Sequence, residues 1–267
     1  MLGPSFGPLL GGVLTQYLTW RSTFWFLAIW TGVTTLGFIW PYKETFRKER
    51  SSTYQNALQK RAASSASKGL AKHERTQTTQ PLEEELHHAK LSLLSLNPFP
   101  SMLSVLRRWT NLSVLATSGI IFGFSYSVQY TGSLVLARTY GLSALEIGLV
   151  LFGYGCGSII GSTVGGHQSD LYWRKGKERL ANAGKEGEKP PAEVRMRTPL
   201  WTLPWLPGLV AAYGWLAETH QHLAGVTVVL FFTGFAAMWT YSALTAYLVD
   251  SNTGNAAIAA AANSLFR

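Results

Sequence analysis

Long apolar segments alternate with polar, charged segments along the whole chain. Five apolar segments are long enough, or nearly so, to cross a hydrocarbon core of ~30 Å as helices that rise ~1.5 Å per residue. They are Trp20–Trp40, Asn111–Leu136, Ser143–Gly166, Leu200–Ala217 and Leu223–Val249. Leu2–Leu18 and Ala256–Phe266 are shorter and look like spans clipped at either end. The pattern predicts an all-α membrane protein with about seven transmembrane helices, the clipped ones included.

Charge is concentrated between the apolar segments. Lys43–Arg108 and Asp170–Arg197 hold 12 and 8 of the 23 Lys and Arg residues, in a chain of net charge +9. Because basic loops stay on the cytoplasmic side of a membrane, both blocks are expected there. The same distribution argues against a nucleic-acid partner, since the basic residues lie in loops between apolar helices. The expected partner is a lipid bilayer, that of the plasma membrane or alternatively of the vacuole.

The same pattern divides the chain. We expect a helix pair at 1–41, a cytoplasmic central loop at 42–110 and a second helical part at 111–267, with a further cytoplasmic loop at 170–199. Cys156 is the single cysteine, which excludes an internal disulfide and a metal site built on thiolates. No nucleophile–base pair, metal-ligand cluster or phosphate-binding loop stands out, so we expect no catalytic residue, metal or cofactor, and no enzyme.

Glycine and proline are unusually dense in the first apolar segment. Such residues are costly in a soluble helix, but in a membrane they let neighbouring helices approach closely. The element Gly7-Pro8-Leu9-Leu10-Gly11-Gly12, preceded by Gly3-Pro4, closely resembles the antiporter signature in the fifth transmembrane helix of the major facilitator superfamily. The motif residues are Gly3, Pro4, Gly7, Pro8, Gly11 and Gly12.

A second superfamily signature would fall between helices eight and nine. Here Gly166, Asp170, Arg174 and Lys175 match it, whereas Trp173 stands where the family usually has Gly. We expect Gly166 to allow close helix packing. Asp170 is expected to accept hydrogen bonds from the end of a neighbouring helix, with helix five the favoured neighbour, and Arg174 and Lys175 to pair with Asp170 or hold lipid headgroups.

Taken together, the chain resembles a fragment, from helix five to early helix eleven, of the fungal twelve-helix drug:proton antiporter branch. The resemblance implies transport of small molecules by alternating access in the full-length parent, as proton-coupled efflux of a drug, xenobiotic or metabolite. The alternative is a non-transporting membrane protein, either a truncated remnant or an assembly or regulatory protein.

Polar and aromatic groups within the spans are candidates for a substrate cavity. Such groups suit amphiphilic or cationic substrates through stacking and cation–π contacts, although bonds between helices would explain each of them as well. The candidates are Tyr126, Gln129, Tyr130, Tyr154, Trp239, Tyr241 and Asn263. No membrane-embedded carboxylate appears in the intact spans, so an acid that couples transport to protons is expected in helices one to four of the full-length parent.

Overall fold

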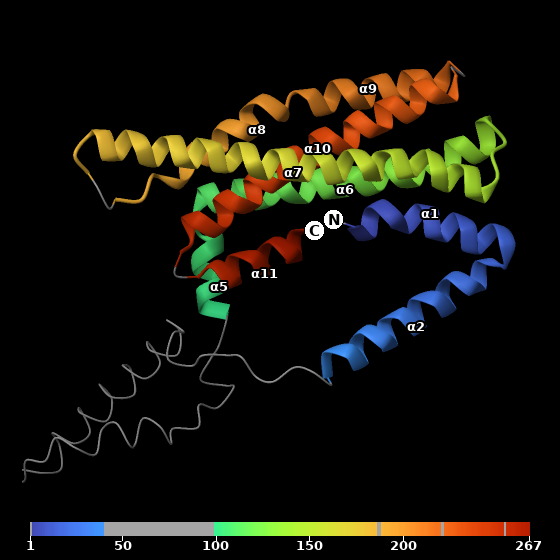
Figure 1. The fold of residues 1–267 in the computed structure, drawn as a ribbon, viewed down its shortest axis with the longest axis horizontal. Helices are drawn as coiled ribbons and strands as arrows, with labels where there is room; N and C mark the ends of the chain where they lie inside the picture. The colour runs from blue at the N-terminus through green and yellow to red at the C-terminus, as the bar shows by residue number, and fades with distance from the viewer. Residues whose placement is uncertain (1, 40–98, 186–187, 220–221, 254) are drawn as a thin grey trace, which may run out of the picture. The chain divides into compact units, whose positions relative to one another are not determined.

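The structure is a computed structural model that describes residues 2–39, 99–185, 188–219, 222–253 and 255–267. Within these ranges every regular element is a helix (Figure 1). The elements are α1 (Leu2–Tyr17), α2 (Trp20–Ile39), α5 (Phe99–Leu106), α6 (Trp109–Thr139), α7 (Ala144–Asn182), the 3-10 helix η3 (Ala192–Met196), α8 (Arg197–Thr202), α9 (Trp205–Glu218), α10 (Leu223–Ser251) and α11 (Ala256–Phe266).

Four of the described helices are long and apolar enough to cross a membrane, namely α2, α6, α7 and α10. Their positions agree with four of the segments predicted from hydropathy, and the all-α membrane fold is confirmed. α1 and α11 are shorter, with 16 and 11 residues. Most of the central loop expected at 42–110 lies outside the described residues, and its last part forms α5 and the start of α6.

The loop expected at 170–199 is helical over its first third. α7 continues to Asn182, because residues 171–182 are rich in Leu, Arg, Lys, Glu and Ala, which favour a helix, and contain no proline. The helix ends where Gly184 takes a positive φ of 75°. The amide of Lys185 then donates to the carbonyl of Leu180 at 3.0 Å, which closes the helix end. At its other end, Ser143 and Glu146 form a capping box.

The span expected at Leu200–Ala217 is two helices instead of one. α8 ends at Thr202 and α9 begins at Trp205, directly after Pro204. Proline has no amide hydrogen and its ring collides with the preceding turn, so the break follows from this residue. Trp201, Trp205 and Trp215 remain exposed along this pair of helices, as side chains that contact lipid would.

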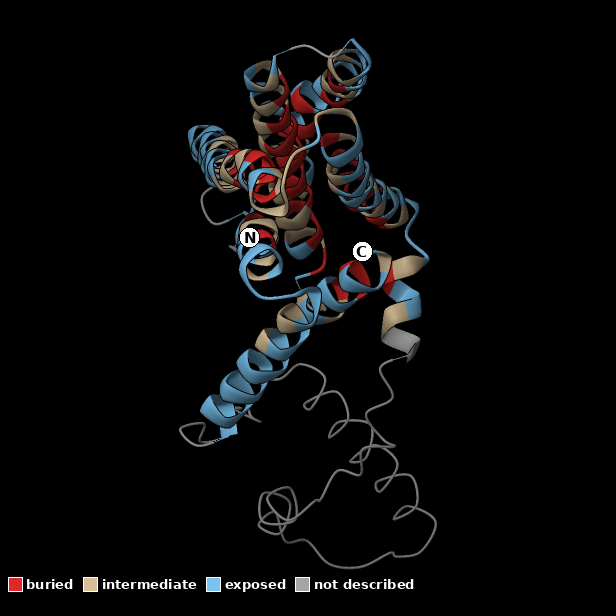
Figure 2. Ribbon diagram, turned by 90° about the vertical axis from the view of Figure 1, so that its right-hand side faces the viewer, coloured by how far each residue is buried: buried red, intermediate tan, exposed pale blue. Residues whose placement is uncertain are grey.

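α10 is the central helix of the fold and packs against α6, α7, α8, α9 and α11. Its contact with α7 is built on glycine, as Gly157, Gly161 and Gly165 of α7 meet the backbone of α10. A Cβ on Gly161 would lie 2.8 Å from the carbonyl carbon of Phe235, and Gly234 of α10 meets Tyr154 in the same way. These glycines therefore serve close packing between helices of the same chain. α2, by contrast, has no buried residue (Figure 2).

Candidate functional site

The glycine motif of α1 packs against α7 through one of its faces. A Cβ on Gly12 would lie 2.6 Å from the carbonyl oxygen of Ala144, and one on Gly148 would lie 2.6 Å from that of Pro8. Further along, the hydroxyl of Ser5 donates to the carbonyl of Gly155 at 3.0 Å. The two backbones are thus in direct contact, as expected of a motif built from small residues.

The remaining glycines of the motif do not take part in this contact. A Cβ on Gly3, Gly7 or Gly11 would meet nothing within 4 Å among the described residues. These three recur every fourth residue and lie on one face, whereas Gly12 is ~100° further round the helix. The close approach is therefore made by Gly12, and Gly11 has no part in it.

Asp170 of the second signature pairs with Arg195, a residue that sequence analysis did not single out. Arg195 Nη1 lies 2.8 Å from Asp170 Oδ1, and its Nε lies 2.5 Å from Asp250 Oδ2. The same Nη1 donates to the hydroxyl of Ser169 at 3.0 Å. Arg195 thereby links the ends of α7 and α10. It lies 25 residues from Asp170 and 55 from Asp250, so no local pattern indicates the partnership.

Among the other residues of the second signature, Gly166 differs from expectation, and Arg174 and Lys175 do not take the first of their two expected roles. Asp170 is paired with Arg195 and not with Arg174 or Lys175, which are exposed and pair with no described residue. Close packing is made by Gly165, where an added Cβ would lie 2.5 Å from the carbonyl oxygen of Trp239. A Cβ added to Gly166 would meet no described residue within 4 Å. Trp173 replaces the usual Gly within an unbroken helix, and its ring lies 4.9 Å from the Arg195 guanidinium.

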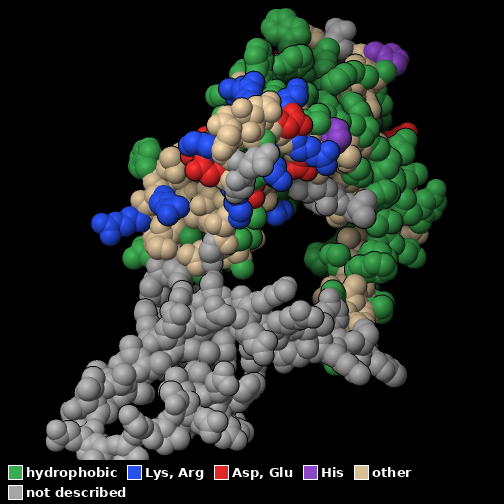
Figure 3. All heavy atoms as spheres, turned by 60° about the vertical axis from the view of Figure 1, so that its left-hand side comes forward, with side chains coloured by type: hydrophobic (Ala, Val, Ile, Leu, Met, Phe, Trp, Pro, Cys, Tyr) green, Lys and Arg blue, Asp and Glu red, His purple; other side chains and the backbone are tan. Residues whose placement is uncertain are grey.

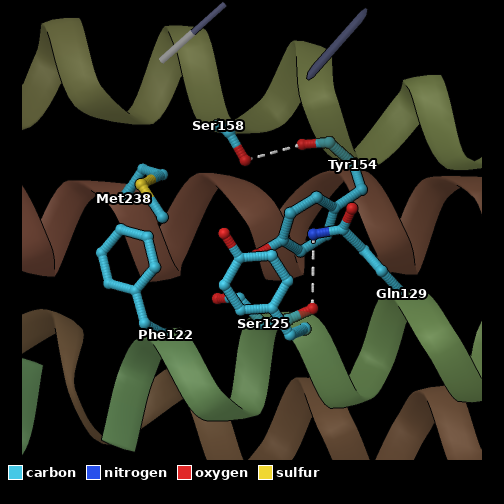
Figure 4. Close-up of a pocket in the computed structure, with 7 residues that line it drawn as sticks. Phe122, Ser125, Gln129, Tyr154, Ser158 and Met238 are labelled. Carbon is cyan, nitrogen blue, oxygen red and sulfur yellow. Dashed lines mark hydrogen bonds between the residues drawn. The ribbon is translucent and has the colours of Figure 1, made fainter. Parts of the chain in front are cut away.

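A pocket lies between α6, α7 and α10 (Figure 4). Three of the predicted cavity residues line it, namely Tyr126 and Gln129 of α6 and Tyr154 of α7. The Tyr154 side chain is 2% exposed, and its buried hydroxyl makes no hydrogen bond of standard geometry among the described residues, although the hydroxyls of Ser125 and Ser158 lie close enough to interact with it. Sequence analysis missed the other lining residues, which are Phe122, Ser125, Ser158 and Met238. The cavity beside the Tyr154 hydroxyl has a volume of about 20 Å³, room for roughly one water molecule, so in this conformation it can admit a water or a single polar group of a ligand.

Two more predicted cavity residues, Tyr241 and Asn263, form a cluster beside the pocket. Asn263 donates to the Tyr241 hydroxyl at 2.9 Å and accepts from the Ser118 hydroxyl at 2.7 Å. The Phe122 ring, which lines the pocket, packs edge-on against Tyr241 at a centroid distance of 4.7 Å. Arg267 contacts both rings. Its guanidinium carbon is 4.0 Å from the Phe122 centroid and 5.6 Å from that of Tyr241, and its Nη1 donates to the Tyr241 hydroxyl at 3.4 Å. An arginine therefore contacts an aromatic residue of the pocket.

Tyr130 and Trp239 do not join the pocket. Tyr130 is 73% exposed and does not line the pocket, although it lies one turn beyond the pocket residue Tyr126 on the same face of α6. Trp239 donates through Nε1 to Gln168 Oε1 at 2.7 Å and so fixes α10 to α7. For Trp239 the interhelical role weighed during sequence analysis therefore fits better than a place in the cavity.

Comparison with known proteins places these features in a family. The family model of the Major Facilitator Superfamily matches residues 1–267. MFS-type transporter phiD of a fungal species is 26% identical over 100% of this chain and 41% of its own length. Citrate exporter 1 of Aspergillus niger and Efflux pump radE of Floropilus chiversii are each 28% identical over 100% of this chain, and over 51% and 46% of their own lengths.

The chain spans about half the length of these curated relatives. No solved structure matches it. The family match nevertheless runs from the first residue to the last, and it agrees with the resemblance carried by the glycine motif. We conclude that this chain belongs to the Major Facilitator Superfamily.

Proposed function

We propose that the transporter formed with this chain exports a small amphiphilic molecule by alternating access, with the pocket between α6, α7 and α10 as part of its substrate site. The unpartnered, buried hydroxyl of Tyr154 carries the proposal, because a polar group left without a partner in a membrane helix bundle is costly unless a ligand uses it. Relatives named as a citrate exporter and an efflux pump support export as the direction.

Alternating access requires two halves that rock against each other around the site. By the resemblance, α1 corresponds to helix five of the first half and α7 to helix eight of the second. The glycine contact between Gly12 and Ala144 would then be a sliding surface between halves, with no side chains to interlock. This arrangement supports the proposed motion.

The charges near the pocket bear on the class of substrate. Aromatic rings of Phe122, Tyr126 and Tyr154 suit an amphiphilic molecule. Arg267, which contacts the Phe122 ring, disfavours the cationic substrates suggested by the resemblance, since like charges repel. We therefore favour a neutral or anionic amphiphile.

Proton coupling is part of the proposal, by resemblance to the antiporter branch. Among the described carboxylates, Glu146 lies in the first turn of α7 and Asp250 in the last turn of α10, where it pairs with Arg195. Neither lies at the middle of its helix. We propose that the coupling acid lies outside the described residues.

The Tyr154 hydroxyl provides the test. The transporter containing this chain, in proteoliposomes, should show saturable transport of a fluorescent amphiphile, and Tyr154→Phe should raise KM about ten-fold by removing one hydrogen bond. Tyr213→Phe is the matched control, because this residue also has a buried hydroxyl without a partner but lies outside the pocket between α6, α7 and α10.

Equal KM values for Tyr154→Phe and the wild type would remove the pocket from the substrate path. Absence of saturable transport from a protein that is folded and inserted would instead favour the non-transporting alternative.

A further inference from the structure

A second cavity, separate from the transport pocket, lies at the far end of α7. Tyr172, Lys175 and Arg179 of α7 line one side, and Arg197, the first residue of α8, lines the other. Gly176, Leu180, Pro191 and Val194 complete its wall. Figure 3 shows Lys and Arg side chains on this face of the molecule, with Asp and Glu side chains among them. Three cations thus converge on one cavity, and none of its lining residues is acidic.

The three cations are not used by the protein itself. Lys175, Arg179 and Arg197 are exposed, and none of their side chains makes a hydrogen bond or ion pair within the described part of the chain. Arg195, two residues before Arg197, contrasts with them because it is buried and held by Asp170 and Asp250. An unpaired cluster of like charge is unfavourable unless an anion neutralises it.

The cavity is held in shape by its surroundings. A Cβ on Gly176 would lie 3.2 Å from Pro190 Cβ and 3.6 Å from Val194 Cγ1, so the segment around η3 packs closely on Gly176 and would have to shift slightly to admit a larger residue. The ion pairs of Arg195 anchor the same segment to α7 and α10. Arg197 is therefore presented to α7 from a fixed position.

The position of this cavity along α7 matches the level of a membrane surface. α7 has 39 residues. At ~1.5 Å per residue, Tyr172 lies ~42 Å and Arg179 ~53 Å from the first residue of the helix, whereas a bilayer with its headgroups is ~40–45 Å thick. The cavity would then lie at the level of the headgroups and just beyond them, on the side where the basic loops are predicted.

We infer that this cavity binds a phosphate monoester, either on the headgroup of a phosphoinositide or on a free soluble phosphate compound. A monoester carries nearly two negative charges at neutral pH, which matches a cluster of three cations better than a single carboxylate does. Arginine side chains bind phosphate oxygens in a bidentate manner, and the Tyr172 hydroxyl is a further donor. Bound phosphate would join α7 to α8 next to the Asp170–Arg195–Asp250 link.

Binding to the chain in phosphatidylcholine nanodiscs tests the inference in two arms. The first measures affinity for soluble inositol 1,4-bisphosphate and for inorganic phosphate. The second measures the unfolding midpoint with and without phosphatidylinositol 4-phosphate in the disc. A midpoint raised by the lipid without binding of the soluble compound identifies the membrane headgroup as the source, whereas tight binding of the soluble compound identifies a free phosphate.

Variants separate a built site from general positive charge. Arg179→Gln and Arg197→Gln should each weaken binding about ten-fold, because each removes a charge-assisted hydrogen bond. Gly176→Leu should also weaken it while all three cations remain. The control Lys177→Gln, an exposed α7 cation outside the cavity, should change affinity by less than about two-fold.

Equal losses for Lys177→Gln and Arg179→Gln would overturn the inference, since the attraction would then be diffuse. Absence of saturable binding in both arms would overturn it as well. Neither result bears on the pocket between α6, α7 and α10. This inference is therefore tested independently of the proposed function.

Discussion

α10 and α2 are both apolar helices long enough to cross a membrane, yet they have opposite roles in this chain. In the most apolar 18-residue stretch of each, 44% of the residues are buried in α10 and none in α2. The mean hydropathy of this stretch is 1.8 in α10 and 1.4 in α2, which does not account for the difference in burial. In a bilayer, an apolar helix surface is covered by lipid tails as favourably as by a neighbouring helix. Helix packing therefore depends on complementary shape and on polar partners. The facing glycines of α7 and α10 provide that shape.

The largest effect is expected from filling this glycine contact. Gly161→Leu would drive a side chain into the backbone at Phe235, and we expect a loss of about 3 kcal/mol or more, seen as loss of folded protein in thermal unfolding in detergent. Gly32→Leu in α2 is the control, since a Cβ there meets nothing within 4 Å. Equal stability of the two variants would contradict a packing role for Gly161.

An intermediate effect is expected at the contact of α1 with α7. Gly12→Leu should destabilise the chain by about 2 kcal/mol through the clash with Ala144, whereas Gly11→Leu should be neutral or slightly stabilising because leucine favours a helix. Thermal midpoints of the two variants in one detergent measure the difference. If Gly11→Leu impairs transport by the whole transporter, the open face of α1 has a partner outside the described residues.

The smallest effect is expected at the ion pairs. Arg195→Gln removes the shared partner of Asp170 and Asp250. Solvent screens the Asp170 pair, whose carboxylate is 61% exposed, but Asp250 is only 27% exposed, so we expect a loss of about 1–2 kcal/mol. Arg21→Gln at the start of α2 should be silent, since Arg21 only covers the Trp20 ring. Urea unfolding of both variants measures their free energies of unfolding. A loss for Arg195→Gln as large as that for Gly161→Leu would show that the ion pairs of Arg195 are far less solvated than the structure indicates.

Sequence analysis predicted well wherever hydropathy or local chemistry decides. Trp20–Trp40 corresponds to α2, and Leu223–Val249 to α10, within a residue or two at the ends. Ala256–Phe266 coincides with α11. The predicted end of the helix at Gly166 was wrong, because α7 continues through polar residues up to Asn182. In that part the helix is stabilised by the helix propensity of its residues and not by burial in lipid, so hydropathy does not indicate where it ends. Pro204 carried a local signal for the break between α8 and α9 that the apolar run concealed.

The residues of the candidate site likewise fall into those that a local sequence pattern indicated and those that it did not. Tyr126, Gln129 and Tyr154 were identifiable because polar groups in apolar spans stand out, and the structure brings them to one pocket. Phe122 and Met238 carry no such signal, since they resemble any apolar residue of a span. Gly165 and Gly166 are equivalent in sequence, and only the rotation of α7 against α10 selects Gly165 for the contact.

By itself the sequence determined the spans, the segregation of charge and the family, because each is written in short-range patterns of hydropathy and in motifs of fixed spacing. Only the tertiary structure decided which faces meet: that Gly12 and not Gly11 contacts α7, that Arg195 reaches both Asp170 and Asp250, and that Tyr154 is buried without a partner. The physical reason is that helix rotation and the crossing of distant segments depend on all contacts at once, and neighbours in the chain do not encode them.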